Sequence, residues 1–143
     1  MGVPPNWFLK RLQTNVIQLT KHFSALAANY DVVLSDVWGV THNGIAAFPE
    51  ACDALVKFRE GGGSVVLITN APRRGAAVAR QIDDFGVPRA AYDDIVSSGD
   101  VTCGVMAERP GQSVFHLGPQ RDISIFDNLG IRFAPLEEAD YVV

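Results

Sequence analysis

The sequence predicts an α/β fold built on a mostly parallel, doubly wound sheet. Short apolar runs typical of buried strands alternate along the chain with helical segments of about 10–15 residues. Several of these runs end in polar residues, as strands do when they lead into a ligand site. The length of 143 residues and the 48% hydrophobic and 20% charged content are typical of one soluble globular domain. They exclude a fibrous chain or a disordered tail.

The first segment is expected to form an amphipathic helix, with Asn6 suited to cap its N-terminus. Its apolar residues follow one another at steps of three and four positions, which places them on one helical face: Leu9, Leu12, Val16, Leu19, Phe23 and Leu26. We expect residues 1–29 to pack as a helix on the domain that follows. The alternative is that this helix pairs with another chain in a homo-oligomer, although two heptads alone rarely sustain a coiled coil.

The next three segments predict a strand, a helix and a second strand. Residues 32–34 are a short apolar run, which predicts a strand buried on both faces. A helix is expected to begin at Phe48, because proline follows at position 49 and suits the first helical turn. The glycines at positions 61–63 end this helix. A second buried strand over residues 64–69 follows them.

The remaining segments continue the alternation. In order, we expect a helix over residues 75–85, a strand at 95–96, a helix from 97 to 106, a strand over 113–117, a helix near 121–129 and a strand at 131–133. Residues 139–143 have the composition of a strand that is just beginning. We therefore expect the protein to extend beyond this sequence.

Charge and composition narrow the range of partners. The net charge is −4, the predicted pI is about 5.2, and the basic residues form no stripe, which argues against nucleic-acid binding. No apolar stretch approaches the roughly 18–20 residues of a membrane span, and the N-terminus does not resemble a signal peptide, so we expect a cytoplasmic protein with no membrane contact. Cys52 and Cys103 are expected to be free thiols.

Polar residues follow the first two predicted strands. Asp36 comes after the apolar run of the first strand, and Thr69 and Asn70 come after the apolar run of the second. Ligands of open parallel sheets bind beyond the carboxyl ends of the strands, so these residues could form a site for an oxyanion beside a nucleophile. The loop after Asp36 contains Gly39 and Gly44, whose amides can approach a small anion closely. Taken singly, each of these residue types at a strand end more often has a structural role in a turn or cap.

The order and spacing of several motifs resemble the haloacid dehalogenase-superfamily hydrolases, with the class IIA phosphatase-like branch as the best match. The motifs are Leu34-Ser35-Asp36-Val37-Trp38-Gly39-Val40, Phe48-Pro49-Glu50-Ala51, Val66-Leu67-Ile68-Thr69-Asn70-Ala71-Pro72, Phe85-Gly86-Val87 and Ile95-Val96-Ser97-Ser98-Gly99. The resemblance covers residues 30–143. It implies a Rossmann-like core, whose front part is residues 30–110, and the beginning of an inserted α/β cap domain at residues 111–143.

The resemblance also implies a chemistry, in which a small phosphorylated metabolite is the substrate. Asp36 would be the nucleophile, and Thr69, the amide of Asn70 and the loop at Gly39 would bind the phosphoryl group. Magnesium would be held by the Asp36 carboxylate and the backbone carbonyl of Trp38. The lysine and the acidic metal-binding motif of the family would lie beyond position 143.

Trp38 departs from the phosphatase pattern. In the family's phosphatases a second aspartate stands at this position and protonates the leaving oxygen, which an indole cannot do. The substrate could have a leaving group that needs no proton, or His42 could replace the missing acid. Alternatively, the protein binds phosphorylated ligands or a partner without catalysis. The dehalogenases of the superfamily carry an aromatic residue at this position, so carbon–halogen chemistry is a further alternative.

Overall fold

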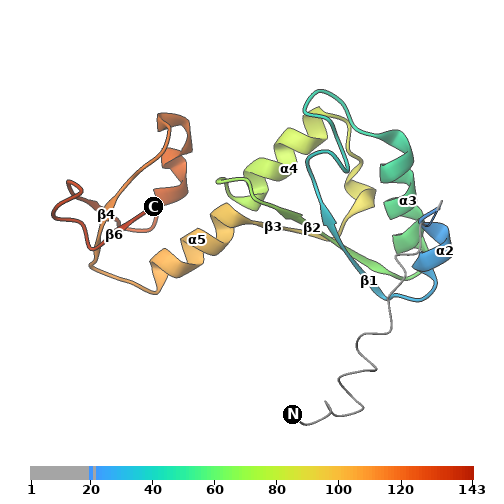
Figure 1. Cartoon of the computed structure of the whole chain (residues 1–143), viewed down its shortest axis with the longest axis horizontal. Helices are drawn as coiled ribbons and strands as arrows, with labels where there is room; N and C mark the ends of the chain where they lie inside the picture. Colours follow the sequence, from blue (N-terminus) through green and yellow to red (C-terminus); the bar gives the residue numbers. More distant parts are fainter. Residues whose placement is uncertain (1–19, 21) are drawn as a thin grey trace, which may run out of the picture.

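The computed structural model of the protein describes residue 20 and residues 22–143 (Figure 1). Within these residues the strands form two parallel sheets. The first has the order β1 (Val32–Asp36), β2 (Ser64–Thr69) and β3 (Asp94–Ser97), and the second has the order β5 (Arg132–Phe133), β4 (Ser113–Phe115) and β6 (Tyr141–Val142). Helix α5 (Ser98–Ala107) runs between the two units in Figure 1. The predicted α/β class with parallel strands is confirmed.

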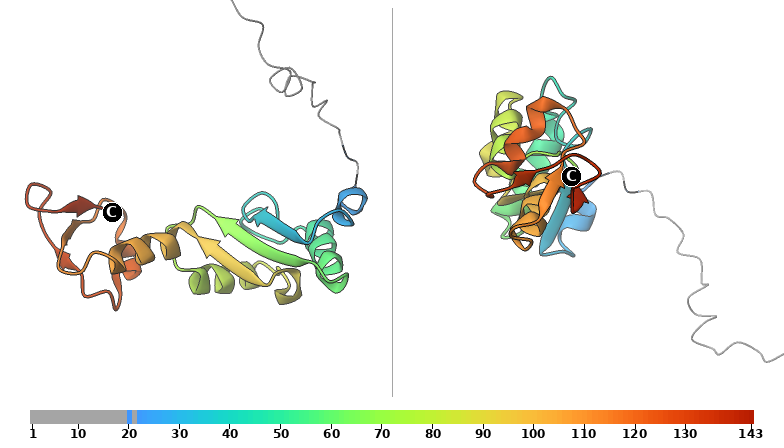
Figure 2. Two further views of the ribbon diagram at one scale, coloured as in Figure 1. Left: turned by 90° about the horizontal axis from the view of Figure 1, so that it is seen from below. Right: turned by 90° about the vertical axis from the view of Figure 1, so that its left-hand side faces the viewer.

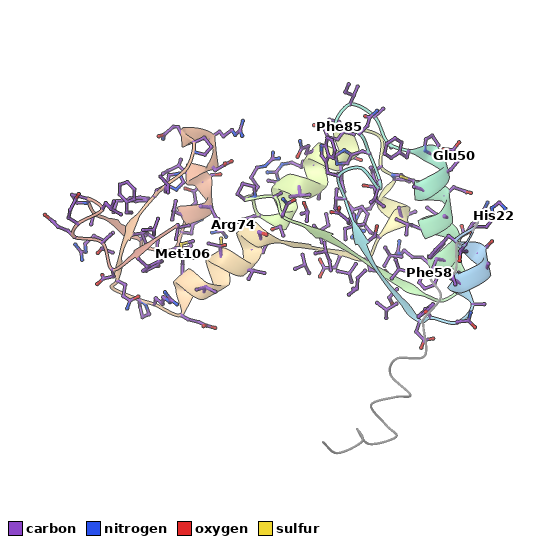
Figure 3. All side chains as sticks on the ribbon, viewed as in Figure 1. His22, Glu50, Phe58, Arg74, Phe85 and Met106 are labelled. Carbon is purple, nitrogen blue, oxygen red and sulfur yellow. The ribbon has the colours of Figure 1, made fainter. Side chains whose placement is uncertain are left out.

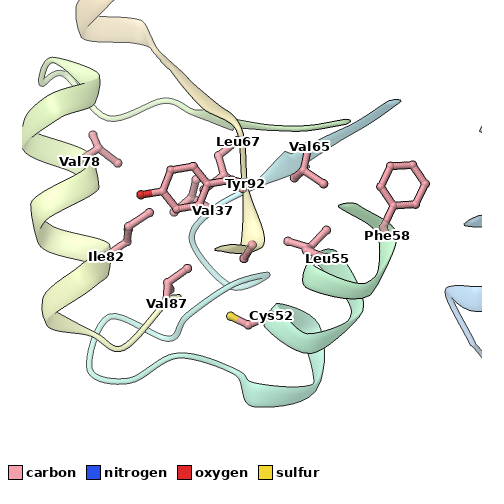
Figure 4. Packing of buried hydrophobic residues seen from close by; sticks show 11 residues of the cluster. Val37, Cys52, Leu55, Phe58, Val65, Leu67, Val78, Ile82, Val87 and Tyr92 are labelled. Atoms are coloured by element: carbon pink, nitrogen blue, oxygen red, sulfur yellow. The ribbon is translucent and has the colours of Figure 1, made fainter. Parts of the chain in front are cut away.

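Helices cover one face of the first sheet. These are α3 (Pro49–Glu60), α4 (Gly75–Asp84) and the short 3₁₀ helix η1 (Arg89–Ala91), which lie on one side of the strands in Figure 2. The core between them and the sheet includes Val65 and Leu67 of β2, which are fully buried (Figure 4). Cys52 of α3 belongs to this core as well, and both Cys52 and Cys103 are free thiols, as predicted.

The opposite face of the first sheet is exposed, so the prediction that the first strand is buried on both faces is wrong for the described residues. Val32 and Leu34 are 52% and 66% exposed, whereas Ser35 is buried. The exposure alternates because side chains of a strand point to opposite faces in turn, and helices pack on only one of them here. A run of three apolar residues is too short to distinguish one buried face from two.

The second unit has its own small core. The buried residues come from α5, β4 and the segment before β5, and they are Cys103, Met106, Val114, Ile125 and Phe126. The helix predicted near residues 121–129 is instead a 3₁₀ helix, η2 (Gln120–Phe126). The Asp122 amide donates to the Pro119 carbonyl three residues back, at 3.0 Å. Asn128 and Gly130, both with φ of 62°, turn the chain before an α-helix could extend.

Only part of the predicted N-terminal helix lies in the described residues. There the chain forms the four-residue helix α2 (Ser24–Ala27), and the ring of Phe23 lies 5.8 Å from that of Phe58 on α3. Residues 9–19 of the predicted apolar face lie outside the described residues. No helix within the described part of the chain is long and apolar enough to cross a membrane.

The start of α5 packs tightly against the loop that follows Asn70. A Cβ atom on Gly99 would lie 2.4 Å from the Arg73 carbonyl group. We expect Gly99→Ala to lower the free energy of unfolding by about 1–3 kcal/mol, the usual cost of overpacking. Gly104→Ala in the same helix is the control, since nothing lies within 4 Å of its Cβ position. It should raise stability by up to about 1 kcal/mol. Equal effects of the two variants in urea titrations would contradict this packing.

Candidate active site

Asp36 and the Thr69–Asn70 pair lie at the same edge of the first sheet. β1 and β2 are parallel neighbours, and Asp36 stands opposite Ile68, one position before Thr69. Adjacent strands lie about 4.8 Å apart, so the two strand ends are close, as the sequence predicts. Among the described residues no hydrogen bond joins the side chains of Asp36 and Thr69. The structure therefore brings the predicted residues to one place without a direct contact between them.

The Asp36 carboxylate is exposed, and one of its two oxygens is hydrogen-bonded to the backbone. Its Oδ1 accepts a hydrogen bond from the Val37 amide at 2.8 Å. Within the described part of the chain its Oδ2 has no hydrogen-bond partner. One oxygen is thus oriented by the backbone, while the other can reach a ligand in solution. This is the arrangement that a nucleophilic or metal-binding carboxylate requires.

Thr69 presents a hydroxyl at the end of β2. Its side chain is 8% exposed, and its Oγ1 accepts a hydrogen bond from the Ala71 amide at 3.2 Å. Because the oxygen is the acceptor in that bond, the hydroxyl proton remains available to donate. A hollow of about 300 Å³ adjoins Thr69; Ser97 and Ser98 line it together with the apolar Ile68, Val96 and Val101, so it is not a polar anion pocket. Asn70, the next residue, is exposed. The Thr69 hydroxyl and the exposed chain at Asn70 can donate hydrogen bonds to a small anion.

The loop after Asp36 is held by its own hydrogen bonds. The Gly39 amide donates to the His42 carbonyl at 2.8 Å, and the Gly44 amide donates to Nδ1 of His42 at 2.9 Å. Both glycines have positive φ values, 79° and 88°, which other residues rarely adopt. The Gly39 amide would have to exchange its present partner to bind a phosphate. Its role in binding therefore stays a prediction.

Trp38 lies on the outside of this loop. Its side chain is 67% exposed, and its Nε1 lies 3.4 Å from the position that a Cβ on Gly44 would take. The indole N–H is a donor that does not give up its proton near neutral pH. Trp38 can therefore contribute contact surface and a hydrogen bond beside Asp36, but not general-acid catalysis.

His42 is built into the scaffold of the loop. It is 4% exposed, its Nδ1 is occupied by the Gly44 amide, and its ring lies 4.8 Å from that of Phe85. Burial lowers the pKa of His42, which favours the neutral ring. A buried neutral imidazole whose Nδ1 accepts a hydrogen bond from the Gly44 amide is poorly placed to protonate a leaving group. The structure therefore argues against His42 as the replacement acid.

The burial of His42 predicts a pH effect on stability. The unfolded chain binds a proton at a pKa near 6.5, above the lowered pKa of the folded state, so the free energy of unfolding should fall as pH drops below about 6.5. The thermal unfolding temperature of His42→Gln should depend less on pH between 7 and 5. Unfolding of the wild type takes up on the order of one proton at His42, and unfolding of the variant does not. The exposed His22→Gln variant is the control and should keep the wild-type profile. A wild-type profile in His42→Gln would refute this interpretation.

The described residues offer a partial set of metal ligands. Residue 20 and residues 22–143 contain no cluster of three or more histidine, cysteine, aspartate or glutamate side chains that could hold a metal ion. Magnesium in phosphoryl-transfer sites needs less, because it keeps several waters and binds one or two carboxylates together with the substrate phosphate. The exposed Asp36 carboxylate, with Oδ2 not hydrogen-bonded in the described residues, fits this type of site.

Asp100 and Arg74 link segments near the site that are distant in sequence. Oδ2 of Asp100 in α5 accepts hydrogen bonds from the Gly75 amide at 2.7 Å and from Oγ of Ser97 at 2.9 Å, so it links α5 to the start of α4. Arg74 donates to the carbonyls of Ile125 and Asp127 at 3.2 and 2.8 Å. Figure 3 shows Arg74 on the side of the first unit that faces the second. The contact of Ser97 with Asp100 spans three residues and follows from the local sequence, whereas the contacts of Asp100 with Gly75 and of Arg74 with Ile125 join distant segments that no local pattern predicts.

A family profile and several solved structures are similar to this chain. A family profile described as haloacid dehalogenase-like hydrolase matches residues 33–132. Among solved structures, a hydrolase of the haloacid dehalogenase-like family from Brucella suis 1330 is 40% identical, with a TM-score of 0.79 over 87% of this chain and 48% of its own. No curated protein matches.

Two phosphatases share the fold at lower identity. A p-nitrophenyl phosphatase from Archaeoglobus fulgidus is 23% identical, with a TM-score of 0.62 over 78% of this chain and 42% of its own. A glycerol phosphate phosphatase from Mycobacterium tuberculosis, solved with calcium, is 23% identical, with a TM-score of 0.60 over 82% of this chain and 34% of its own. The chain thus spans about half or less of the length of these proteins. By the profile match over most of its length, the chain belongs to the haloacid dehalogenase-like hydrolase family.

Proposed function

We propose that the protein is a magnesium-dependent phosphatase that hydrolyses a small phosphorylated metabolite through an aspartyl-phosphate intermediate. The observation that carries this proposal is the Asp36 carboxylate, exposed at the end of β1 with one oxygen free, beside the end of the neighbouring strand β2, where Thr69 stands. The phosphatase names of two solved relatives support the choice of phosphorus over carbon–halogen chemistry.

The reaction has two steps at Asp36. Its free oxygen attacks the phosphorus atom, a P–O bond forms to the carboxylate, and the P–O bond to the leaving oxygen breaks, so that the leaving group departs as an oxyanion. Water then attacks the acyl phosphate, which releases inorganic phosphate and restores the carboxylate. Thr69 and the amide of Asn70 would donate hydrogen bonds to the phosphoryl oxygens in both steps. The Val37 amide keeps the carboxylate in one orientation throughout.

A magnesium ion would be held by Asp36 and the backbone carbonyl of Trp38, with water and substrate phosphate as the other ligands. When bound, it would neutralise the negative charge shared by the carboxylate and the phosphate. Solved structures of the M. tuberculosis phosphatase with calcium and with magnesium support a divalent cation in relatives of this chain.

Trp38 restricts the substrates that this site can use. With no acid beside Asp36 and with His42 buried, the leaving oxygen departs without a proton from either residue. Phosphate esters of acidic alcohols, or acyl and anhydride phosphates, leave readily in this form. We therefore expect the enzyme to prefer such activated phosphates over simple alkyl phosphates.

The test uses this chain extended by the part of the B. suis hydrolase that it does not cover. Magnesium-dependent release of phosphate from p-nitrophenyl phosphate, lost with EDTA and restored by magnesium, is the expected result. Activity that EDTA leaves unchanged would contradict the proposed role of the metal.

The second candidate is a protein that binds phosphorylated ligands without hydrolysing them, and the replacement of the acid by Trp38 favours it. This candidate predicts magnesium-dependent affinity for inorganic phosphate with no release from any ester. Calorimetry on the same extended protein distinguishes the two.

A further inference from the structure

A hollow of about 260 Å³ lies between the first unit and the second. One side of it is the start of α4, and the other side is η2 with the residues that follow it. Its polar lining residues are Arg73, Arg74, Arg80, Ser124, Asp127 and Asn128. Figure 3 shows Arg74 where the two units meet. We call this space the arginine hollow, because three of its lining side chains are guanidinium groups.

The three arginines of the arginine hollow have no carboxylate partner in this chain. Within the described residues, Arg73, Arg74 and Arg80 form no ion pair. Residues 1–19 and 21 contain no aspartate or glutamate that could supply one. Asp127 lines the same hollow, but it contacts Arg74 through its backbone carbonyl, and its carboxylate forms no ion pair in the described chain. Three positive charges thus stand against one carboxylate, an imbalance that a bound anion would reduce.

Several N–H groups around the arginine hollow are available to donate. Nε of Arg74 is buried and has no hydrogen-bond partner in the described structure, although Nη2 of the same side chain donates to two carbonyls. Buried donors without an acceptor are uncommon, because the lost hydrogen bonds to water are not replaced. Arg80 is exposed and makes no hydrogen bond within residues 22–143. Both side chains can therefore bind an acceptor without breaking an ion pair.

The first turn of α4 adds a backbone donor to the same hollow. Oδ2 of Asp100 accepts a hydrogen bond from the Gly75 amide at 2.7 Å. The next amide, that of Ala76, has no partner in the described part of the chain, and Ala76 lines the hollow. Free amides and the helix dipole both favour an anion at this end of a helix. The charge of the arginines and the polarity of the helix thus select the same class of ligand.

We propose that the arginine hollow binds a compact oxyanion, either a free inorganic ion or the phosphate group of a small ester, and that this anion joins α4 to η2. Arg80 and the Ala76 amide would donate from the first unit. The Ser124 hydroxyl and the side-chain amide of Asn128 would donate from the second. Guanidinium groups suit this ligand, since their planar donors match two oxygens of a phosphate.

The bound anion would strengthen a link that the chain already makes. Arg74 ties the start of α4 to η2 through the carbonyls of Ile125 and Asp127. An anion beside this contact would add bonds between the same two elements and hold the second unit in one position relative to the Thr69 loop. That consequence for catalysis rests on the proposed function, whereas the binding of the anion does not.

The experiment titrates the full 143-residue chain with inorganic phosphate in a calorimeter, in EDTA and at constant ionic strength. We expect one saturable site with a dissociation constant of about 1 mM or lower. Arg80→Gln should weaken binding at least about tenfold, because it removes a charged donor. Ser124→Ala should weaken it as well, because η2 supplies part of the site. Arg121→Gln is the matched control, since Arg121 is an exposed arginine of η2 that does not line the hollow.

Circular dichroism checks that each variant is folded. Equal weakening by Arg80→Gln and Arg121→Gln would overturn the proposal, because it would show only a general attraction between anions and positive charge. Absence of saturable binding below about 10 mM phosphate would overturn it too. An unchanged affinity in Ser124→Ala would refute the link between α4 and η2.

Two further titrations separate this site from the candidate active site and identify the source of the anion. Thr69→Val should leave phosphate binding in EDTA unchanged, and loss of binding in Thr69→Val with full binding in Arg80→Gln would overturn the proposal. Glycerol phosphate is compared with inorganic phosphate and sulfate. Tighter binding of glycerol phosphate would assign the hollow to a phosphorylated metabolite, and tighter binding of the inorganic ions would assign it to a free ion. No step measures catalysis, so failure of the phosphatase proposal would leave these results unaffected.

Discussion

Replacement of Asp36 by asparagine should reduce phosphate release by at least about 10³-fold in the protein extended by the B. suis segment. An amide has the shape of the carboxylate but is not a nucleophile, so the first P–O bond cannot form. The side-chain amide oxygen introduced by Asp36→Asn can still accept the hydrogen bond from the Val37 amide, which preserves the local fold. The measurement is kcat for p-nitrophenyl phosphate at saturating magnesium.

The matched control is Asp31→Asn, which removes an exposed carboxylate just before the same strand. It should keep kcat within about twofold of the wild type, since Asp31 lies at the opposite end of β1. Asp36→Asn activity within about tenfold of the wild type would remove Asp36 from the role of nucleophile. If the wild-type protein binds phosphate with magnesium but releases none from the ester, the non-catalytic candidate is correct.

The main features of the site could be predicted from the sequence because they follow from parallel pairing. Once residues 32–34 and 64–69 are interpreted as neighbouring parallel strands, Asp36 and Thr69 must end at one edge. The cap of α5 also depends on neighbouring residues alone, since Oγ of Ser97 accepts a hydrogen bond from the Asp100 amide three residues further along the chain. In each case short-range pattern and topology determine the position of the residue.

The features that were missed depend on contacts distant in sequence. The burial of His42 results from the packing of Phe85, 43 positions later, and a lone histidine in a glycine-containing loop does not reveal it. The exposure of Leu34 depends on which helices pack on each face, which a three-residue apolar run cannot specify. η2 is a 3₁₀ helix and not an α-helix, and the spacing of apolar residues over so short a segment does not distinguish the two.

Trp38→Asp should raise the turnover of an unactivated substrate such as glycerol phosphate by about 10²–10⁴-fold in the extended protein. The introduced carboxyl group would stand two positions after Asp36, where it can protonate the leaving oxygen. Turnover of p-nitrophenyl phosphate should change little, because nitrophenolate leaves without a proton. The measurement is the ratio of kcat/KM for the two substrates.

Trp38→Phe is the control for the loss of the indole. It removes the Nε1 donor near Gly44 but introduces no acid, so it should leave the substrate ratio near the wild-type value. An equal rise for both substrates in Trp38→Asp would mean that the indole obstructs access to Asp36 rather than replacing an acid. No rise for either substrate would show that the acid is not what limits this site, and the preference for activated phosphates would then need another cause.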